Sequence, residues 1–341
     1  MSAKHPPRYR HLITAVKLLA GGSIIAWLAW HAAQHEMFQQ LAQGQKRWGL
    51  LVLAVLLCGI NVCMTFVRWY YVSRAAGVPL KFGEAVRLGT LGYILNFVSP
   101  GSVGGDLFKG AVLAKDRPGR RTAALTTVFV DRSVAMVSFL LYACVGFAAI
   151  LASGAELPAE ALAAGWGAVA ILAGVVGCAA LFLSPVVNHP AVADRVRRVP
   201  VLGEPLSWLL STWNVYRKGL RWLGVAFLVC VGGHIALVSS FYCVGKGLPL
   251  TSPSLLSHVF MVPFACLSGA IPLFPGGLGA MEGALDFLYY WMGAPRNTGA
   301  FVAFGYRLAM IAIAIVATPY YLTHQAVVRR GLEEAEHLQE D

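Results

Sequence analysis

The chain has 341 residues, of which 57% are hydrophobic and 13% are charged, and its formal net charge is +11. An ordinary soluble domain carries about 25% charged residues, and its polar surface could not cover this much apolar area. The composition therefore excludes a soluble enzyme and predicts an all-α polytopic membrane helix bundle. The basic residues lie between apolar runs rather than on one polar face, which favours anionic lipid over nucleic acid as the partner.

The first apolar run, 12–32, follows a basic N-terminal segment, as the apolar part of a signal peptide does. It is about 20 residues long, which is enough to cross a hydrocarbon core of roughly 30 Å. No small-residue cleavage pattern closes it, so we expect a membrane helix that is retained. Further runs of spanning length are predicted at 49–72, 122–152, 161–183, 221–246 and 297–323.

Two further apolar regions are interrupted. The region 84–116 is broken by NFVSPGSVGGD, and the region 254–293 is broken by IPLFPGGLG. Each piece is about 10–20 residues long, which is short for a full crossing. Such pairs are typical of re-entrant hairpins, which occur at membrane depth only where they are buried in protein or line a wet cavity. We therefore expect six full crossings and two re-entrant elements.

The positions of Lys and Arg predict the orientation. With a cytoplasmic N-terminus, twenty of them fall on the inner side and four on the outer side, as the positive-inside rule requires. This arrangement predicts a multi-pass protein of the bacterial plasma (inner) membrane with both termini in the cytoplasm. Residues 1–325 would form one transmembrane domain, and 326–341 a short cytoplasmic tail.

The two interruptions resemble each other. Both contain PGxxG, and an ungapped offset of 175 residues also aligns a phenylalanine and an arginine in the helix that follows. Three crossings separate the interruptions, so the two halves, about 12–152 and 161–323, should be inverted repeats. Paired interrupted segments in inverted halves indicate a transport site near the midplane. The matched pairs are Pro100 with Pro275, Gly101 with Gly276, Gly104 with Gly279, Phe129 with Phe304, and Arg132 with Arg307.

Arg132 and Arg307 each lie about ten residues inside a predicted crossing. Arginine is costly in lipid unless it is paired or hydrated, and its planar fork suits phosphate. One interpretation is that both arginines and the N-termini of the half-helices hold a lipid phosphate. The alternative is that Arg132 pairs with Asp106, and Arg307 with Glu282, to lock the repeats together. The two interpretations are compatible.

A basic group lies just beyond the first interruption. It is either a vestibule that attracts lipid headgroups or simply part of the orientation signal. Its members are Lys109, Lys115, Arg117, Arg120 and Arg121. The seven cysteines lie in apolar runs, none forms CxxC, and no histidine has a metal-ligand spacing, so no metal or cofactor is expected.

At these residues the chain resembles the membrane domain of lysylphosphatidylglycerol synthases and its stand-alone, flippase-like relatives. The resemblance rests on Arg68-Trp69, PGSVGGD, FPGGLGAMEG with its GGLGxxE core, and Arg307, and it covers most of 10–325. It implies a bundle that moves or binds a phospholipid or polyprenyl-linked lipid. By motif match, Gly276, Gly277, Gly279, Glu282 and Arg307 would line the site. The first motif departs from the family pattern, because Gly105 stands before Asp106.

The leading hypothesis is a lipid translocase that works without ATP, since no P-loop pattern is present. A membrane-embedded transferase with Glu282 or Asp106 as general base is a second possibility, and a non-catalytic partner of a lipid or envelope synthesis enzyme is a third. The aminoacyl-transfer domain of the synthases is not found, so we expect no lysine transfer and no catalytic residue. The candidate lipid-phosphate site comprises Pro100, Gly101, Gly104, Asp106, Lys109, Arg132, Gly276, Gly277, Gly279, Glu282 and Arg307.

Overall fold

The computed structural model describes residues 43–98, 104–183, 212–213, 215–270, 279–325 and 327. Within these residues the regular structure is helical, and five helices are long and apolar enough to cross a membrane. They are α3 (Trp48–Ala75), α6 (Arg121–Ala152), α7 (Ala159–Leu183), α10 (Leu220–Gly247) and α13 (Thr298–Thr323). Each begins and ends within three residues of a predicted crossing, so the polytopic helical fold is confirmed. The run predicted at 12–32 lies outside the described residues.

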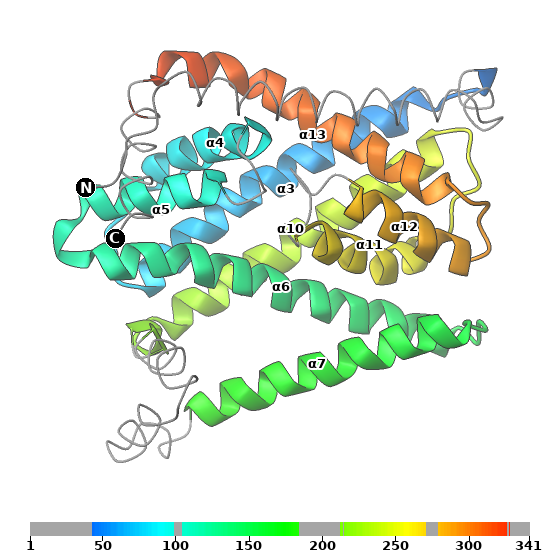
Figure 1. Ribbon diagram of the computed structural model, residues 1–341, viewed down its shortest axis with the longest axis horizontal. Helices are drawn as coiled ribbons and strands as arrows, with labels where there is room; N and C mark the ends of the chain where they lie inside the picture. Colours follow the sequence, from blue (N-terminus) through cyan, green and yellow to red (C-terminus); the bar gives the residue numbers. More distant parts are fainter. Residues whose placement is uncertain are drawn as a thin grey trace, which may run out of the picture.

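Each interrupted region forms a pair of shorter helices. These are α4 (Phe82–Val98) with α5 (Gly104–Asp116), and α11 (Leu255–Ala270) with α12 (Ala280–Trp291). The longest has 17 residues, or about 26 Å, which is less than a hydrocarbon core. Figure 1 shows α4 and α5 in the half of the bundle where α6 begins, and α11 and α12 in the other half. The two hairpins therefore enter the bundle from opposite ends.

The two hairpins occupy the same place in two successive sets of four helices, which we call series. The series α3, α4, α5, α6 and the series α10, α11, α12, α13 follow each other at the spacing of the sequence motifs. Each helix of the second series begins within three residues of the position that lies 175 residues after the start of its counterpart. The described part of the chain thus repeats its helix order and its helix spacing, with α7 between the two series (Figure 1).

The two series pack closely on each other and do not form separate units. Helices α3 and α10 pack along each other at the centre, α4 packs on α13, and α11 packs on α6 (Figure 1). The Tyr93 hydroxyl on α4 donates to the Met310 carbonyl on α13 at 2.9 Å. At the other crossing, a Cβ at Gly146 of α6 would lie 2.5 Å from the Phe260 nitrogen, so only glycine allows this approach of α11. One helix of each hairpin therefore packs on the last helix of the other series.

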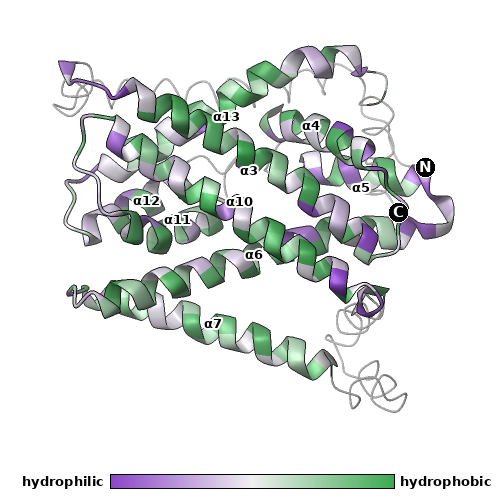
Figure 2. Cartoon of the chain, turned by 180° about the vertical axis from the view of Figure 1, so that it is seen from behind, coloured by the Kyte–Doolittle hydropathy of each residue, from purple (hydrophilic) through white to green (hydrophobic). Residues whose placement is uncertain are grey.

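The outer surface of the helices is apolar, as expected where lipid is the solvent. Hydrophobic residues extend along the length of the helices in Figure 2. Large aliphatic side chains are strongly exposed on this surface, including Val316 at 81% exposed and Leu228 at 70%. This surface confirms a multi-pass membrane protein.

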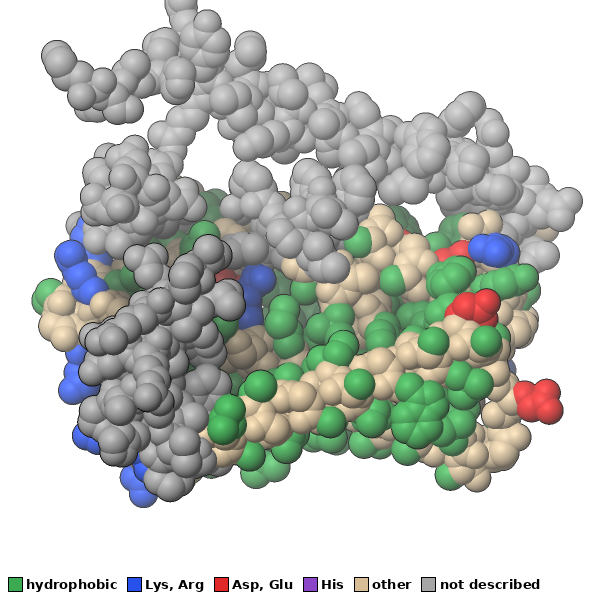
Figure 3. All heavy atoms as spheres, turned by 60° about the horizontal axis from the view of Figure 1, so that its bottom comes forward, with side chains coloured by type: hydrophobic (Ala, Val, Ile, Leu, Met, Phe, Trp, Pro, Cys, Tyr) green, Lys and Arg blue, Asp and Glu red, His purple; other side chains and the backbone are tan. Residues whose placement is uncertain are grey.

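Charge separates the two ends of the bundle. We call the end where α3 and α5 finish and α6 and α10 begin the basic end. Lys and Arg side chains gather at this end, whereas carboxylates stand out at the opposite end (Figure 3). Among the described residues, the basic loops between α3 and α4, between α5 and α6 and before α10, which the sequence assigns to one side of the membrane, thus lie at one end of the bundle.

Candidate ion-pair site at the hairpin helices

The first turn of α5 brings together three charged side chains. Asp106 accepts bonds from Arg132 of α6, at 2.9 Å from Nε and 2.8 Å from Nη2. Its other oxygen lies 2.7 Å from Lys109 Nζ, one turn further along α5. The Arg132 side chain is 29% exposed and that of Asp106 is 17% exposed, so the pair can be reached from outside the protein. A carboxylate in the first helical turn also matches the positive end of the helix dipole.

The first turn of α12 repeats this pairing. Arg307 of α13 donates from Nε to Glu282 at 2.5 Å. The second Glu282 oxygen accepts the backbone N–H of Gly279 at 2.9 Å, so this carboxylate also caps the helix. Gly279 has φ +87°, a conformation that favours glycine and lets the chain turn sharply into α12. Both predicted ion pairs are therefore observed, and each joins a half-helix to the crossing that follows it.

The two pairs are not equivalent in sequence. At the offset of 175 residues, Met281 corresponds to Asp106, and Glu282 is one position later. Glutamate is one methylene longer than aspartate, and the pair with Arg307 still forms. Lys109 corresponds to Ala284, so the second pair lacks the additional cation. The same contact is thus built twice with different residues, and only the α5 site has a lysine.

A second ion pair lies beside the α5 site, and the sequence analysis missed it. Arg68 of α3 binds Asp131 of α6 in bidentate geometry, at 2.7 and 2.8 Å. Its Nη1 also donates to the Cys230 sulfur on α10 at 3.2 Å. Both side chains are at most 10% exposed. Arg68 lies within α3, and the pair joins α3 to α6 inside the bundle.

The two ion pairs form one cluster at the start of α5. Asp131 and Arg132 are neighbours on α6, and Lys109 Nζ lies 5.3 Å from the centre of the Trp69 ring, next to Arg68. We call these charged residues the α5 cluster; its members are Arg68, Asp106, Lys109, Asp131 and Arg132. They carry three positive and two negative formal charges. The second series supplies one of each, Arg307 and Glu282, because Cys243 stands in place of Arg68 and Tyr306 in place of Asp131.

The predicted site residues Gly104, Asp106, Lys109 and Arg132 lie at the start of α5 or beside it, and Gly279, Glu282 and Arg307 do so at α12. The described members of the predicted site thus form two separate groups, one on each hairpin. The predicted members Pro100, Gly101, Gly276 and Gly277 lie outside the described residues.

The predicted basic group divides into two parts. Lys109 turns inward to Asp106 and is 12% exposed. Arg117 and Arg120 instead bind the loop between α3 and α4, donating to the carbonyls of Pro79 and Gly77. Among the described residues, no three His, Cys, Asp or Glu side chains are placed to hold a metal ion.

Comparison with known proteins identifies related chains. The profile of a family described as "Lysylphosphatidylglycerol synthase TM region" matches residues 14–317. The chain is also 24% identical over 297 residues to a "UPF0104 membrane protein" of Methanothermobacter thermautotrophicus, an alignment that covers 80% of this chain and 85% of that protein.

Proposed function

Because the chain belongs to the family of lysylphosphatidylglycerol synthase transmembrane regions, we propose that it binds a lipid by its phosphate group at the hairpins and moves it across the membrane without nucleotide hydrolysis. The observation that carries this proposal is the pairing of an intramembrane arginine with a carboxylate at the start of each hairpin's second helix. The lipid would be a phospholipid or a polyprenyl-linked phosphate. The membrane would be the bacterial inner membrane, with both termini cytoplasmic.

The chemistry of the pairs supports an exchange of partners. Arg132 and Arg307 present the planar fork that binds phosphate as well as carboxylate. In the empty state Asp106 and Glu282 neutralise these arginines, which avoids the cost of an isolated charge in lipid. An arriving phosphate replaces the carboxylate on the arginine, and the N-terminus of the half-helix adds favourable dipoles. The exchange keeps the arginine paired at each stage.

The charge balance favours the α5 cluster as the stronger anion site. Its five side chains carry one excess positive charge, whereas Glu282 and Arg307 are balanced. Lys109 can therefore keep Asp106 neutralised while Arg132 turns to the phosphate. We assign initial capture of the lipid to the α5 cluster and a weaker, transient contact to Arg307.

The arrangement of the hairpins supports movement rather than binding alone. The α4–α5 hairpin enters from the basic end and α11–α12 from the opposite end (Figure 1). In inverted repeats of this kind, each hairpin offers access to one side of the membrane. We propose that repeat one, about 12–152, and repeat two, about 161–323, are such a pair.

The test is lipid movement in vesicles that contain the purified chain. A phosphatidylglycerol with a fluorescent acyl chain is reduced by an impermeant quencher only in the outer leaflet, so transfer from the inner leaflet shows as further loss of signal. We expect Arg132→Ala to slow transfer by about tenfold or more, since each lost charge-assisted bond costs roughly 1.5–3 kcal/mol. Lys109→Ala should weaken transfer less, and Arg307→Ala should slow it without abolishing capture.

Arg296→Ala is the matched control, because Arg296 lies over the Tyr290 ring in the loop before α13, away from both pairs. It should transfer lipid like the wild type. If Arg132→Ala and Arg307→Ala both transfer lipid at the wild-type rate, the proposed mechanism is excluded.

A further inference from the structure

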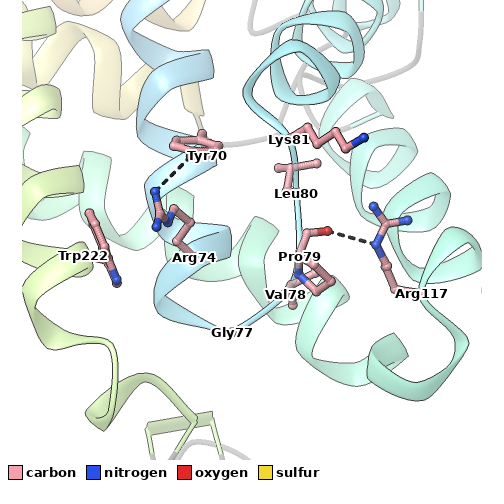
Figure 4. Close-up of a pocket in the computed structure, with 9 residues that line it drawn as sticks. All are labelled: Tyr70, Arg74, Gly77, Val78, Pro79, Leu80, Lys81, Arg117 and Trp222. Atoms are coloured by element: carbon pink, nitrogen blue, oxygen red, sulfur yellow. Dashed lines mark hydrogen bonds between the residues drawn. The ribbon is translucent and has the colours of Figure 1, made fainter.

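The basic end carries a groove that the proposed transport site does not use (Figure 4). Its volume is about 560 Å³. One wall is formed by Tyr70 and Arg74 near the end of α3 and by Trp222 of α10. The other wall is the loop 77–81 between α3 and α4, behind which Arg117 lies. None of these residues belongs to the α5 cluster or to the pair at α12.

The loop wall of the groove is held in place by arginines from outside it. Arg117 Nε donates to the Pro79 carbonyl at 2.9 Å, and Arg120 Nη1 donates to the Gly77 carbonyl at 2.6 Å. Arg117 also contacts Glu84 of α4 at 3.2 Å. A loop fixed at both carbonyls loses little freedom when a ligand binds, so the groove is preorganised.

Arg74 is the cation that the groove presents. Its guanidinium stacks 4.1 Å from the centre of the Trp222 ring and donates to the Tyr70 hydroxyl at 3.0 Å. Within the described part of the chain it has no carboxylate partner. Because the aromatic ring covers the flat face of the guanidinium, its remaining N–H groups point along the edge, where a phosphate oxygen can accept them.

The surroundings of Arg74 combine positive charge with apolar area. Lys81 lies on the loop wall, and its ammonium group has no acceptor among the described residues. Tyr70 packs edge-on against Phe82 at 5.6 Å, and Phe82 is 51% exposed. Aromatic rings of this kind lie at the level of lipid headgroups, and cations there attract anionic lipid by about 1 kcal/mol each.

We propose that this groove binds the phosphate-bearing headgroup of an anionic phospholipid from the leaflet at the basic end. Arg74 holds the phosphate, Lys81 adds positive charge, and Tyr70 and Phe82 contact the glycerol and the start of the acyl chains. The groove is a second lipid site, separate in its residues from the transport site. The membrane lipid held there would brace the loop 77–81 against the start of α10.

Native mass spectrometry of the full chain in detergent tests this proposal. The probes are dioctanoyl phosphatidylglycerol, dioctanoyl phosphatidylcholine and soluble glycerol phosphate. The wild type should bind two molecules of phosphatidylglycerol. Arg74→Ala should lose one, with its affinity lowered about tenfold, and Arg132→Ala should lose the other. Arg221→Ala is the matched control, because Arg221 also lies over the Trp222 ring, at 4.9 Å, but does not line the groove.

The outcomes separate the two sites. If Arg74→Ala keeps both phosphatidylglycerol molecules, or if Arg221→Ala loses as much binding as Arg74→Ala, the groove is not a specific site. If glycerol phosphate or phosphatidylcholine binds there as well as phosphatidylglycerol, the assignment to an anionic lipid is wrong. If Arg132→Ala keeps both molecules while Arg74→Ala loses one, the groove stands and the transport site fails.

Discussion

The Arg68–Asp131 pair shows how a single contact can join distant parts of a membrane bundle. The two residues are 63 positions apart, on α3 and α6, and both carboxylate oxygens are bonded. Inside a membrane protein neither partner has water to replace the other. Removing one partner of a buried pair leaves an uncompensated charge, which costs about 3–5 kcal/mol. The pair therefore fixes α3 to α6 beside the α5 cluster.

Asp131→Ala should accordingly destabilise the protein strongly. We expect a large drop in the unfolding midpoint of the purified chain in detergent, because Arg68 would remain buried without its counter-charge. The double variant Arg68→Met with Asp131→Leu removes both charges and should recover much of the loss. Thermal unfolding followed by circular dichroism measures both variants. A double variant no more stable than Asp131→Ala would contradict this account of the pair.

At the scale of helices, the close crossing within the first hairpin depends on two glycines. A Cβ at Gly105 of α5 would lie 1.8 Å from the Gly92 carbonyl oxygen of α4, a distance that no side chain can occupy. The Asn96 side chain accepts the Gly105 N–H at 2.9 Å and ties the two helices together at the same point. The hairpin can keep Asp106 facing Arg132 only while this contact holds.

Gly105→Ala should therefore separate α4 from α5 and disturb the α5 cluster. We expect a lower yield of folded protein, a lower unfolding midpoint and loss of lipid transfer. Gly83→Ala in the same hairpin is the control, since a Cβ there meets no atom within 4 Å and alanine favours the helix by about 0.5–1 kcal/mol. Equal stability of the two variants would show that the crossing tolerates a side chain.

Much of the helical layout could be predicted, because long apolar runs and their Pro-Gly interruptions are local signals. The pairs of Arg132 with Asp106 and Arg307 with Glu282 could also be predicted, since an arginine inside a crossing needs a nearby carboxylate. The Arg68–Asp131 pair could not, because Arg68 lies close enough to the end of α3 to be taken for a loop charge. The inward position of Lys109 could not be predicted either. Lys109 is close in sequence to Lys115 and Arg117, and only the turn of α5 shows that it points toward Asp106.

At the scale of the whole molecule, the distribution of charge predicts which end faces the cytoplasm. The loops at the basic end carry most of the Lys and Arg, so the positive-inside rule places them on the cytoplasmic side. In intact cells an impermeant maleimide should label Ser153→Cys, in the loop after α6 at the opposite end. It should label Lys218→Cys, before α10, only after the membrane is permeabilised. The wild-type chain gives the background, and the reverse pattern would invert the orientation.

The way each hairpin lies on the other series has a consequence for how the two halves fold. The α4–α5 hairpin packs on α13, and α11–α12 packs on α6 and carries the Phe260 contact with Gly146. One helix of each hairpin, α4 or α11, thus packs on the last helix of the other half, while its partner, α5 or α12, packs on the last helix of its own half. If the chain were cut between α7 and α10, each fragment would expose the hairpin helix that packs on the other half, so each should be degraded when made alone. Made together, they should reassemble, because the chain connection between them is not what holds the hairpins in place.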